Sequence, residues 1–304
     1  MTSVRLLAGL LMTALAGSAM AAEKLELKQQ PKSKSVYQTE TKTEQVLTIA
    51  DNNIETKATA FIVTAFTAGE RAADGSLTIT EKHDVMQTSL QLPGVEFQFD
   101  SANPDKEPSI PQLKPIADAL RTSFKTPITS VIEKDGKVRE VSVPEAALAD
   151  LDPAFKGLFD PDKLKKAAVQ ARSMFPDQPV SPGDTWERNA DVNLDSAQTL
   201  SFIIKFEYTG VVDKDGRKLH RIVSKPLSVT YSMAADSPSP LKITQSDLKI
   251  TDSEGELLFN QELGITDKDH SRMRIEGPMT FTIGGQELAG KVNLQITKTS
   301  TRQP

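Results

Sequence analysis

The chain of 304 residues contains no cysteine. Disulfide bonds, metal-thiolate sites and thiol nucleophiles are therefore excluded, and the usual attachment point for a bacterial lipid anchor is missing. Histidine is scarce as well: His83, His220 and His270 show none of the short spacings that bring two imidazoles together at a zinc ion. We expect these three histidines at the surface, and we expect neither a metal nor another cofactor.

Long apolar runs and catalytic signatures are also missing. After residue 22 no stretch approaches the roughly 20 apolar residues that span a bilayer, so no stable membrane anchor is expected in the rest of the chain. The nucleophile elbow G-x-S-x-G, the phosphate-binding loop and S-x-x-K with its partner motifs do not occur. These absences favour a non-catalytic protein, although the abundant carboxylates leave a glycosidase-like pair open.

Charge of one sign does not dominate the sequence. Charged residues make up 25%, with both signs interspersed, and the net charge is -5. Such a balance argues against nucleic acid as the main partner.

The first 21 residues have the layout of a secretory signal peptide. Arg5 precedes an apolar run from Leu6 to Ala16, and the small-x-small triplet Ala19-Met20-Ala21 follows. We predict cleavage after Ala21 and export to the periplasm or the extracellular space. The remainder, 22–304, is expected to form a single domain.

Alternating polar and apolar residues predict strands in two separate regions, 35–100 and 186–300. Asp74-Gly75 and Gly284-Gly285 are typical of hairpin turns between such strands. Strands of this length favour broad, curved antiparallel sheet with one face in water.

A helical insert is predicted between the two β regions, over 108–176. Apolar residues recur at helical spacing from Leu113 to Phe124, and Asp160-Pro161 supplies an N-cap followed by a proline at the first helical position. A short hairpin is expected at 128–143. The inward stripe of the last helix is predicted to be Leu164, Ala167, Ala168, Ala171 and Phe175. The expected fold is therefore α+β: a long curved antiparallel sheet, in one piece or two, with the helices packed on its concave face.

The single tryptophan, Trp186, follows a turn formed by Pro182, Gly183 and Asp184. Glycine supplies the flexible dihedral and the Asp184 carboxylate can accept hydrogen bonds from nearby amides. We predict that Trp186 anchors the end of the helix to the sheet; an aromatic platform for a sugar or a lipid is the alternative.

The same residues carry a resemblance. Gly183-Asp184-Thr185-Trp186, preceded by Phe175-Pro176 and followed by long strands, resembles an exported bacterial family of unknown function that is marked by a G-D-x-W turn after a helical segment. The architecture is also similar to that of envelope lipid carriers. That likeness implies a curved half-barrel with an acyl chain lying between sheet and helices, but fold alone does not assign function.

Three functions follow as hypotheses. The first is a non-catalytic exported protein that binds a lipid or another apolar or amphipathic molecule between sheet and helices, with Phe175, Ala167 and Ala171 facing the ligand. The second is a structural or interaction module of the cell envelope, which would pair with a partner protein through exposed edges beside the strand 291–300. The third is a hydrolase of envelope polymers that uses carboxylates near Trp186, such as Asp184 and Glu187.

Overall fold

The computed structural model describes residues 22–149, 151–194, 198–234, 237 and 242–304. The predicted signal peptide, residues 1–21, lies outside the described residues.

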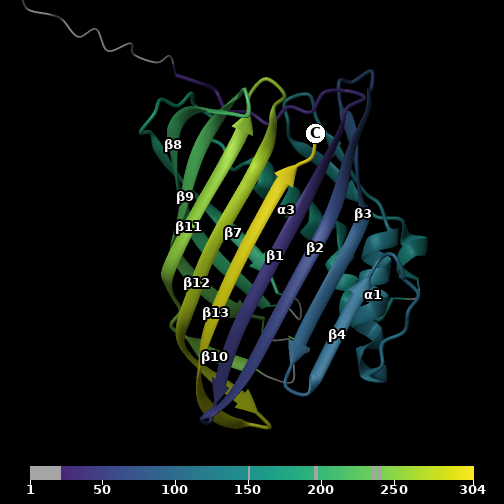
Figure 1. Ribbon diagram of the computed structural model, residues 1–304, viewed down its shortest axis with the longest axis vertical. Helices are drawn as coiled ribbons and strands as arrows, with labels where there is room; N and C mark the ends of the chain where they lie inside the picture. Colours follow the sequence, from purple (N-terminus) through teal and green to yellow (C-terminus); the bar gives the residue numbers. More distant parts are fainter. Residues whose placement is uncertain (1–21, 150, 195–197, 235–236, 238–241) are drawn as a thin grey trace, which may run out of the picture.

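The described strands form one antiparallel sheet that curves strongly (Figure 1). The order across the sheet is β6-β5-β3-β2-β1-β13-β12-β11-β9-β8-β7, while β4 pairs with β3 and β10 pairs with β12. The strands are β1 Lys34–Ile49, β2 Asn52–Arg71, β3 Leu77–Leu92, β4 Val95–Asp100, β5 Ile128–Ile132, β6 Val138–Ser142, β7 Thr185–Asn193, β8 Gln198–Lys214, β9 Arg217–Met233, β10 Lys242–Ser246, β11 Lys249–Asn260, β12 Ile265–Ile283 and β13 Gln286–Arg302.

Both β regions therefore join a single sheet. The first strand, β1, pairs with the last, β13, from Tyr37 opposite Arg302 to Ile49 opposite Gly290. The hairpin turns predicted at Asp74-Gly75 and Gly284-Gly285 are confirmed, and Gly75, Gly284 and Gly285 all have positive φ. Tight turns of this kind join long neighbouring strands with little loss of pairing.

The helical insert is smaller than predicted. Its two longer helices are α1, Lys114–Lys125, and α3, Pro161–Arg172; the hairpin β5–β6 and the short elements η1 Pro111–Leu113, η2 Glu145–Leu148, α2 Pro153–Lys156 and η3 Gly157–Phe159 make up the rest of its regular structure. The predicted cap of α3 is confirmed, because the Asp160 carboxylate accepts hydrogen bonds from the amides of Asp162 and Lys163. The molecule is thus mainly a sheet.

Helix α3 lies between β6 and β7, the strands at the two ends of the main strand order. On one side Leu164 and Ala168 pack against the apolar cluster that includes strand β6. On the other side the Gln170 side chain accepts a hydrogen bond from the amide of Asp191 at 2.9 Å, and Lys166 forms a 2.8 Å ion pair with the Asp191 carboxylate in β7. The helix therefore covers the outer sides of β6 and β7, where free backbone groups would otherwise invite pairing with another chain.

The segment 22–33 crosses one end of the curved sheet, at the top of Figure 1. Leu25 is only 2% exposed and belongs to the apolar cluster beneath the segment. Backbone hydrogen bonds hold it along its length: Glu23 with Val180, Lys28 with Gly264, and Lys32 with Gly69. This crossing segment, defined as residues 22–33, closes that end of the concave side.

Two predictions are wrong. Strand β13, which contains 291–300, lies in the middle of the sheet between β1 and β12, so it offers no exposed edge to a partner. The predicted inward stripe of α3 is also too wide: Ala167 and Ala171 are exposed. They occupy a helix face between the side that meets β6 and the side that meets β7, because a helix wedged between two edges buries two narrow faces rather than one broad one.

Candidate functional site

The middle of the concave face is lined by polar side chains from the three central strands. The register identifies the face: Thr39 lies opposite Ile62, which packs with α1, and Asp269 lies opposite Leu257, which packs in the cluster under the crossing segment. We call this set the concave strip. Its residues are Thr39, Thr41, Asp269, Ser271, Lys298 and Ser300.

Side chains of the concave strip contact one another and remain partly exposed to solvent. Lys298 Nζ lies 3.3 Å from Asp269 Oδ2, and the Thr39 hydroxyl donates a hydrogen bond to Ser300 Oγ at 2.9 Å. The side chains of Lys298 and Asp269 are 46% and 34% exposed. The helices therefore do not cover the centre of the concave face, and a charged pair remains accessible there.

Titratable groups in β3 extend this polar region toward α3. The Thr64 hydroxyl and His83 Nδ1 are 3.0 Å apart, and Glu81 is next on the same face, opposite Phe66. Burial raises the pKa of the Glu81 carboxyl and lowers the pKa of the His83 imidazole. Both shifts favour the uncharged forms, as expected where side chains lose contact with water.

Tyr37 completes the polar region from β1. Its ring meets Phe66 edge to face at 5.8 Å, and its hydroxyl donates a hydrogen bond to the Thr266 carbonyl at 2.9 Å. Burial raises the pKa of Tyr37 to about 12. The phenol therefore stays neutral across the physiological range.

Apolar clusters lie on either side of the concave strip. One joins β2, β3 and β4 to α1, and the other joins β7, β8, β9, β12 and β13. The buried members of the first are Met86, Phe97, Phe99 and Ala117; those of the second are Leu200, Phe202, Val229 and Ile275. The concave face is therefore amphipathic, with a polar centre and apolar flanks.

Trp186 lies where α3 ends and β7 begins. Its indole Nε1 donates a hydrogen bond to the Met174 carbonyl at 2.8 Å, and its ring stacks on Phe206 with centroids 5.7 Å apart. Phe175 is buried beside it and contacts Phe259 at 4.7 Å. Trp186 itself is partly buried against this cluster.

The turn before Trp186 is closed by local hydrogen bonds. Gly183 has φ +96° and donates its amide to the Tyr208 carbonyl, while the ring of Pro182 lies against Gly210. The Asp184 carboxylate accepts the Ser181 amide at 2.7 Å, which ties it to its own turn.

The hydrolase hypothesis needs Asp184 and Glu187 to face each other, and the structure does not bring them together. Glu187 is exposed and, as the neighbour of Trp186 along β7, points from the opposite face of the sheet. Among the described residues, moreover, no cluster of three or more His, Asp or Glu side chains could hold a metal ion.

The prediction of surface histidines is wrong for His220. Its Nδ1 lies 2.8 Å from the Tyr208 hydroxyl in the core, and burial lowers the pKa of its imidazole. His83 is partly buried on the concave face, whereas His270 bonds Thr299 on the convex face. Sequence spacing provides no signal for Glu81 or His83, because their partial burial depends on the β2–β3 register, in which they lie opposite Phe66 and Thr64.

We expect the substitution Glu81→Gln to stabilise the protein at neutral pH and to change little in acid. Below the ordinary glutamate pKa of 4.5, the Glu81 carboxyl is protonated in both the folded and the unfolded protein. As the pH rises, the carboxyl of the unfolded protein ionises first, because burial raises the pKa of Glu81 in the folded protein, and the wild type loses stability. The melting temperature of Glu81→Gln should therefore exceed that of the wild type by more at pH 7 than at pH 4. Glu187→Gln, on the exposed convex face, is the control; a difference independent of pH would contradict the prediction.

Comparisons with known proteins do not assign a family. No family model and no curated protein matches the chain. Among solved structures, one that describes lipid-protein interactions in lipovitellin aligns over 91% of this chain with 10% identity and a TM-score of 0.47; this chain spans only 26% of that one. OccK5 from Pseudomonas aeruginosa aligns over 91% of this chain and 100% of its own, with 9% identity and a TM-score of 0.26.

The translocator domain of the autotransporter NalP from Neisseria meningitidis aligns over 91% of each chain, with 7% identity and a TM-score of 0.22. With every one of these TM-scores below 0.5, the three likenesses carry no argument about function. In the part of the chain that the structure describes, no helix is long and apolar enough to cross a membrane.

Proposed function

We propose that this is a non-catalytic exported protein that binds an amphipathic molecule on the concave face of its sheet. The observation that carries the proposal is the arrangement of that face: an accessible polar centre with Lys298 and Asp269, between two apolar clusters. A ligand with a polar head and an apolar chain would satisfy both parts at once. The likeness of the Gly183–Trp186 turn to an exported family remains a prediction consistent with this role.

Polar groups next to the concave strip also support the proposal. Glu81 lies opposite Phe66 and His83 lies opposite Thr64, and burial shifts the pKa of both groups toward their uncharged forms, which still donate and accept hydrogen bonds. A hydrogen-bonding head group placed beside the concave strip would be a partner for these groups. Neighbouring apolar side chains would bury the apolar chain of the ligand away from water.

Native mass spectrometry of the full chain purified from the expressing cells tests the proposal. We expect a co-purifying mass, and binding of added oleic acid or of lysophosphatidylethanolamine. Ser300→Phe should reduce binding at least about tenfold, since a bulky ring on the concave strip would occupy the space of the ligand. Thr301→Phe, the next residue on the exposed convex face, is the matched control and should bind as the wild type does.

Two results would overturn the proposal. A ligand-free mass together with no binding of either lipid would refute the proposal. Equal binding by Ser300→Phe and the wild type would place any lipid elsewhere and would equally overturn the concave site. Circular dichroism of both variants should show an unchanged fold, because the two substitutions lie on one well-paired strand.

A further inference from the structure

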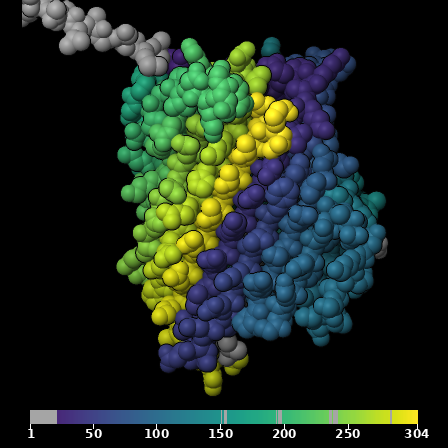
Figure 2. Space-filling view, in the orientation of Figure 1, coloured from purple at the N-terminus to yellow at the C-terminus, as the bar shows by residue number. Residues whose placement is uncertain are grey.

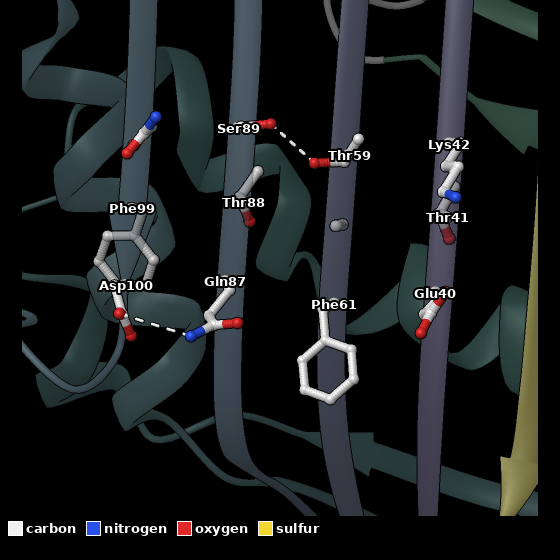
Figure 3. Close-up of a pocket in the computed structure, with 12 residues that line it drawn as sticks. Glu40, Thr41, Lys42, Thr59, Phe61, Gln87, Thr88, Ser89, Phe99 and Asp100 are labelled. Atoms are coloured by element: carbon white, nitrogen blue, oxygen red, sulfur yellow. Dashed lines mark hydrogen bonds between the residues drawn. The ribbon is translucent and has the colours of Figure 1, made fainter.

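The convex face carries a groove that the concave site does not use. It lies over β1, β2, β3 and β4, on the side of the sheet opposite α1, and has a volume of about 510 Å³. Figure 2 shows this face of the molecule, and Figure 3 shows the residues that line the groove. The strand register arranges its side chains as two cross-strand rows. The first row is Glu40, Phe61, Gln87 and Asp100, and the second is Lys42, Thr59, Ser89 and Gln98.

Side-chain size explains why a groove forms on a convex surface. In the second row Thr59 and Ser89 are short, and their hydroxyls lie 2.7 Å apart, so they form a low floor. The long side chains of Lys42 and Gln98 stand at the two ends of this row. The Phe61 ring lies beside Thr59 along β2 in Figure 3, and the groove follows from this alternation of short and long residues.

Phe61 is the aromatic residue that distinguishes this groove. It is partly exposed, and its neighbours along β2, Ala60 and Ile62, point to the concave side. Gln87 lies directly opposite it and donates a hydrogen bond to Asp100 Oδ2 at a long 3.4 Å. An apolar ring therefore stands next to amide and carboxylate groups with remaining hydrogen-bonding capacity.

Charge narrows the class of ligand. Glu40 and Asp100 outnumber Lys42 in the two rows, and the next row along the strands adds Glu44 and Glu96 against Lys57. A surface with more carboxylates than lysines disfavours phosphates, sulfates and nucleic acid. The groups present suit a neutral molecule that has hydroxyls on its edges and an apolar face.

We propose that this groove binds a neutral β-linked oligosaccharide of glucose-like configuration, with one pyranose ring stacked on Phe61. Such a ring carries its C–H bonds on its two faces and its hydroxyls around its edge, so the face meets the phenyl ring while the edge reaches Gln87, Asp100 and Glu40. The site is separate from the concave face and does not depend on the lipid proposal.

Saturation-transfer NMR on the full chain tests the proposal with cellotriose, tri-N-acetylchitotriose and a sulfated trisaccharide as probes. We expect transfer to the two neutral sugars and none to the sulfated one. Phe61→Ala should weaken binding at least about tenfold, as loss of a central aromatic contact does. Ile203→Ala removes an exposed apolar side chain from another part of the sheet and should leave binding unchanged.

A second variant reports contact with the sugar directly. In a Trp186→Phe background, Phe61→Trp places the single indole in the groove, where a stacked sugar should shift its emission on titration. Three results would overturn the proposal: no binding of either neutral sugar at 10 mM, equal binding by Phe61→Ala and the wild type, or preference for the sulfated probe. An unchanged indole emission at saturating sugar would also count against it.

Discussion

Replacing Trp186 with alanine is expected to lower the free energy of unfolding by about 3 kcal/mol. This is the lower end of the range for large aromatic residues in cores, because Trp186 is only partly buried. The substitution removes the stack on Phe206 and leaves the Met174 carbonyl without its indole donor. For a chain of this size, thermal unfolding should then occur roughly 6 °C lower.

Trp186→Phe is the matched control and should recover part of the loss, since a phenyl ring can still contact Phe206 but cannot donate to Met174. Fluorescence checks the same contacts directly because the chain has one tryptophan. We expect wild-type emission to lie to the blue of free tryptophan and to resist acrylamide. Readily quenched, red-shifted emission of the wild type, together with a melting temperature that Trp186→Ala leaves unchanged, would favour the alternative of an exposed binding platform.

Replacing Gly264 with alanine is expected to cost about 3 kcal/mol and to detach the crossing segment 22–33. Gly264 has φ +67°, and a Cβ atom there would lie 2.6 Å from both the carbonyl oxygen and the Cβ of Lys28. Left-handed backbone costs an ordinary residue about 1–2 kcal/mol, and the overlap adds a similar amount. Since the Lys28 amide donates to the Gly264 carbonyl at 2.8 Å, the contact that holds the segment would be lost.

Gly94→Ala separates these two causes. Gly94 has φ +73° in the β3–β4 turn, but nothing lies within 4 Å of the added Cβ. This variant should therefore lose only about 1 kcal/mol. Hydrogen exchange at the Lys28 amide should speed up in Gly264→Ala and not in Gly94→Ala; equal costs and equal exchange would show that the crossing segment does not depend on this contact.

Local features of the chain were predictable because their causes are local. A dipeptide such as Asp74-Gly75 adopts positive φ wherever a tight hairpin needs it, and Asp160-Pro161 caps a helix with its own carboxylate and ring. The long alternating strands and the absence of cysteine likewise indicated a broad antiparallel sheet with an ordinary core. The positions of turns, strands and the cap of α3 therefore followed from neighbouring residues.

The candidate sites depended on contacts between distant segments. In β1 the residues of both faces are polar, with Thr39 and Thr41 on one side and Glu40 and Lys42 on the other, so alternation cannot say which face meets the helices. Only the pairing of Thr39 with Ile62 decides it.

By itself the sequence determined the kinds of element and where the chain turns, since these rest on backbone preferences within a few residues. Tertiary structure alone decided that β13 is central, that α3 lies between the edges β6 and β7, and that Glu81 and His83 are partly buried on the concave face. The physical reason is that strand register and side-chain burial are set by residues up to hundreds of positions apart, which no local pattern encodes.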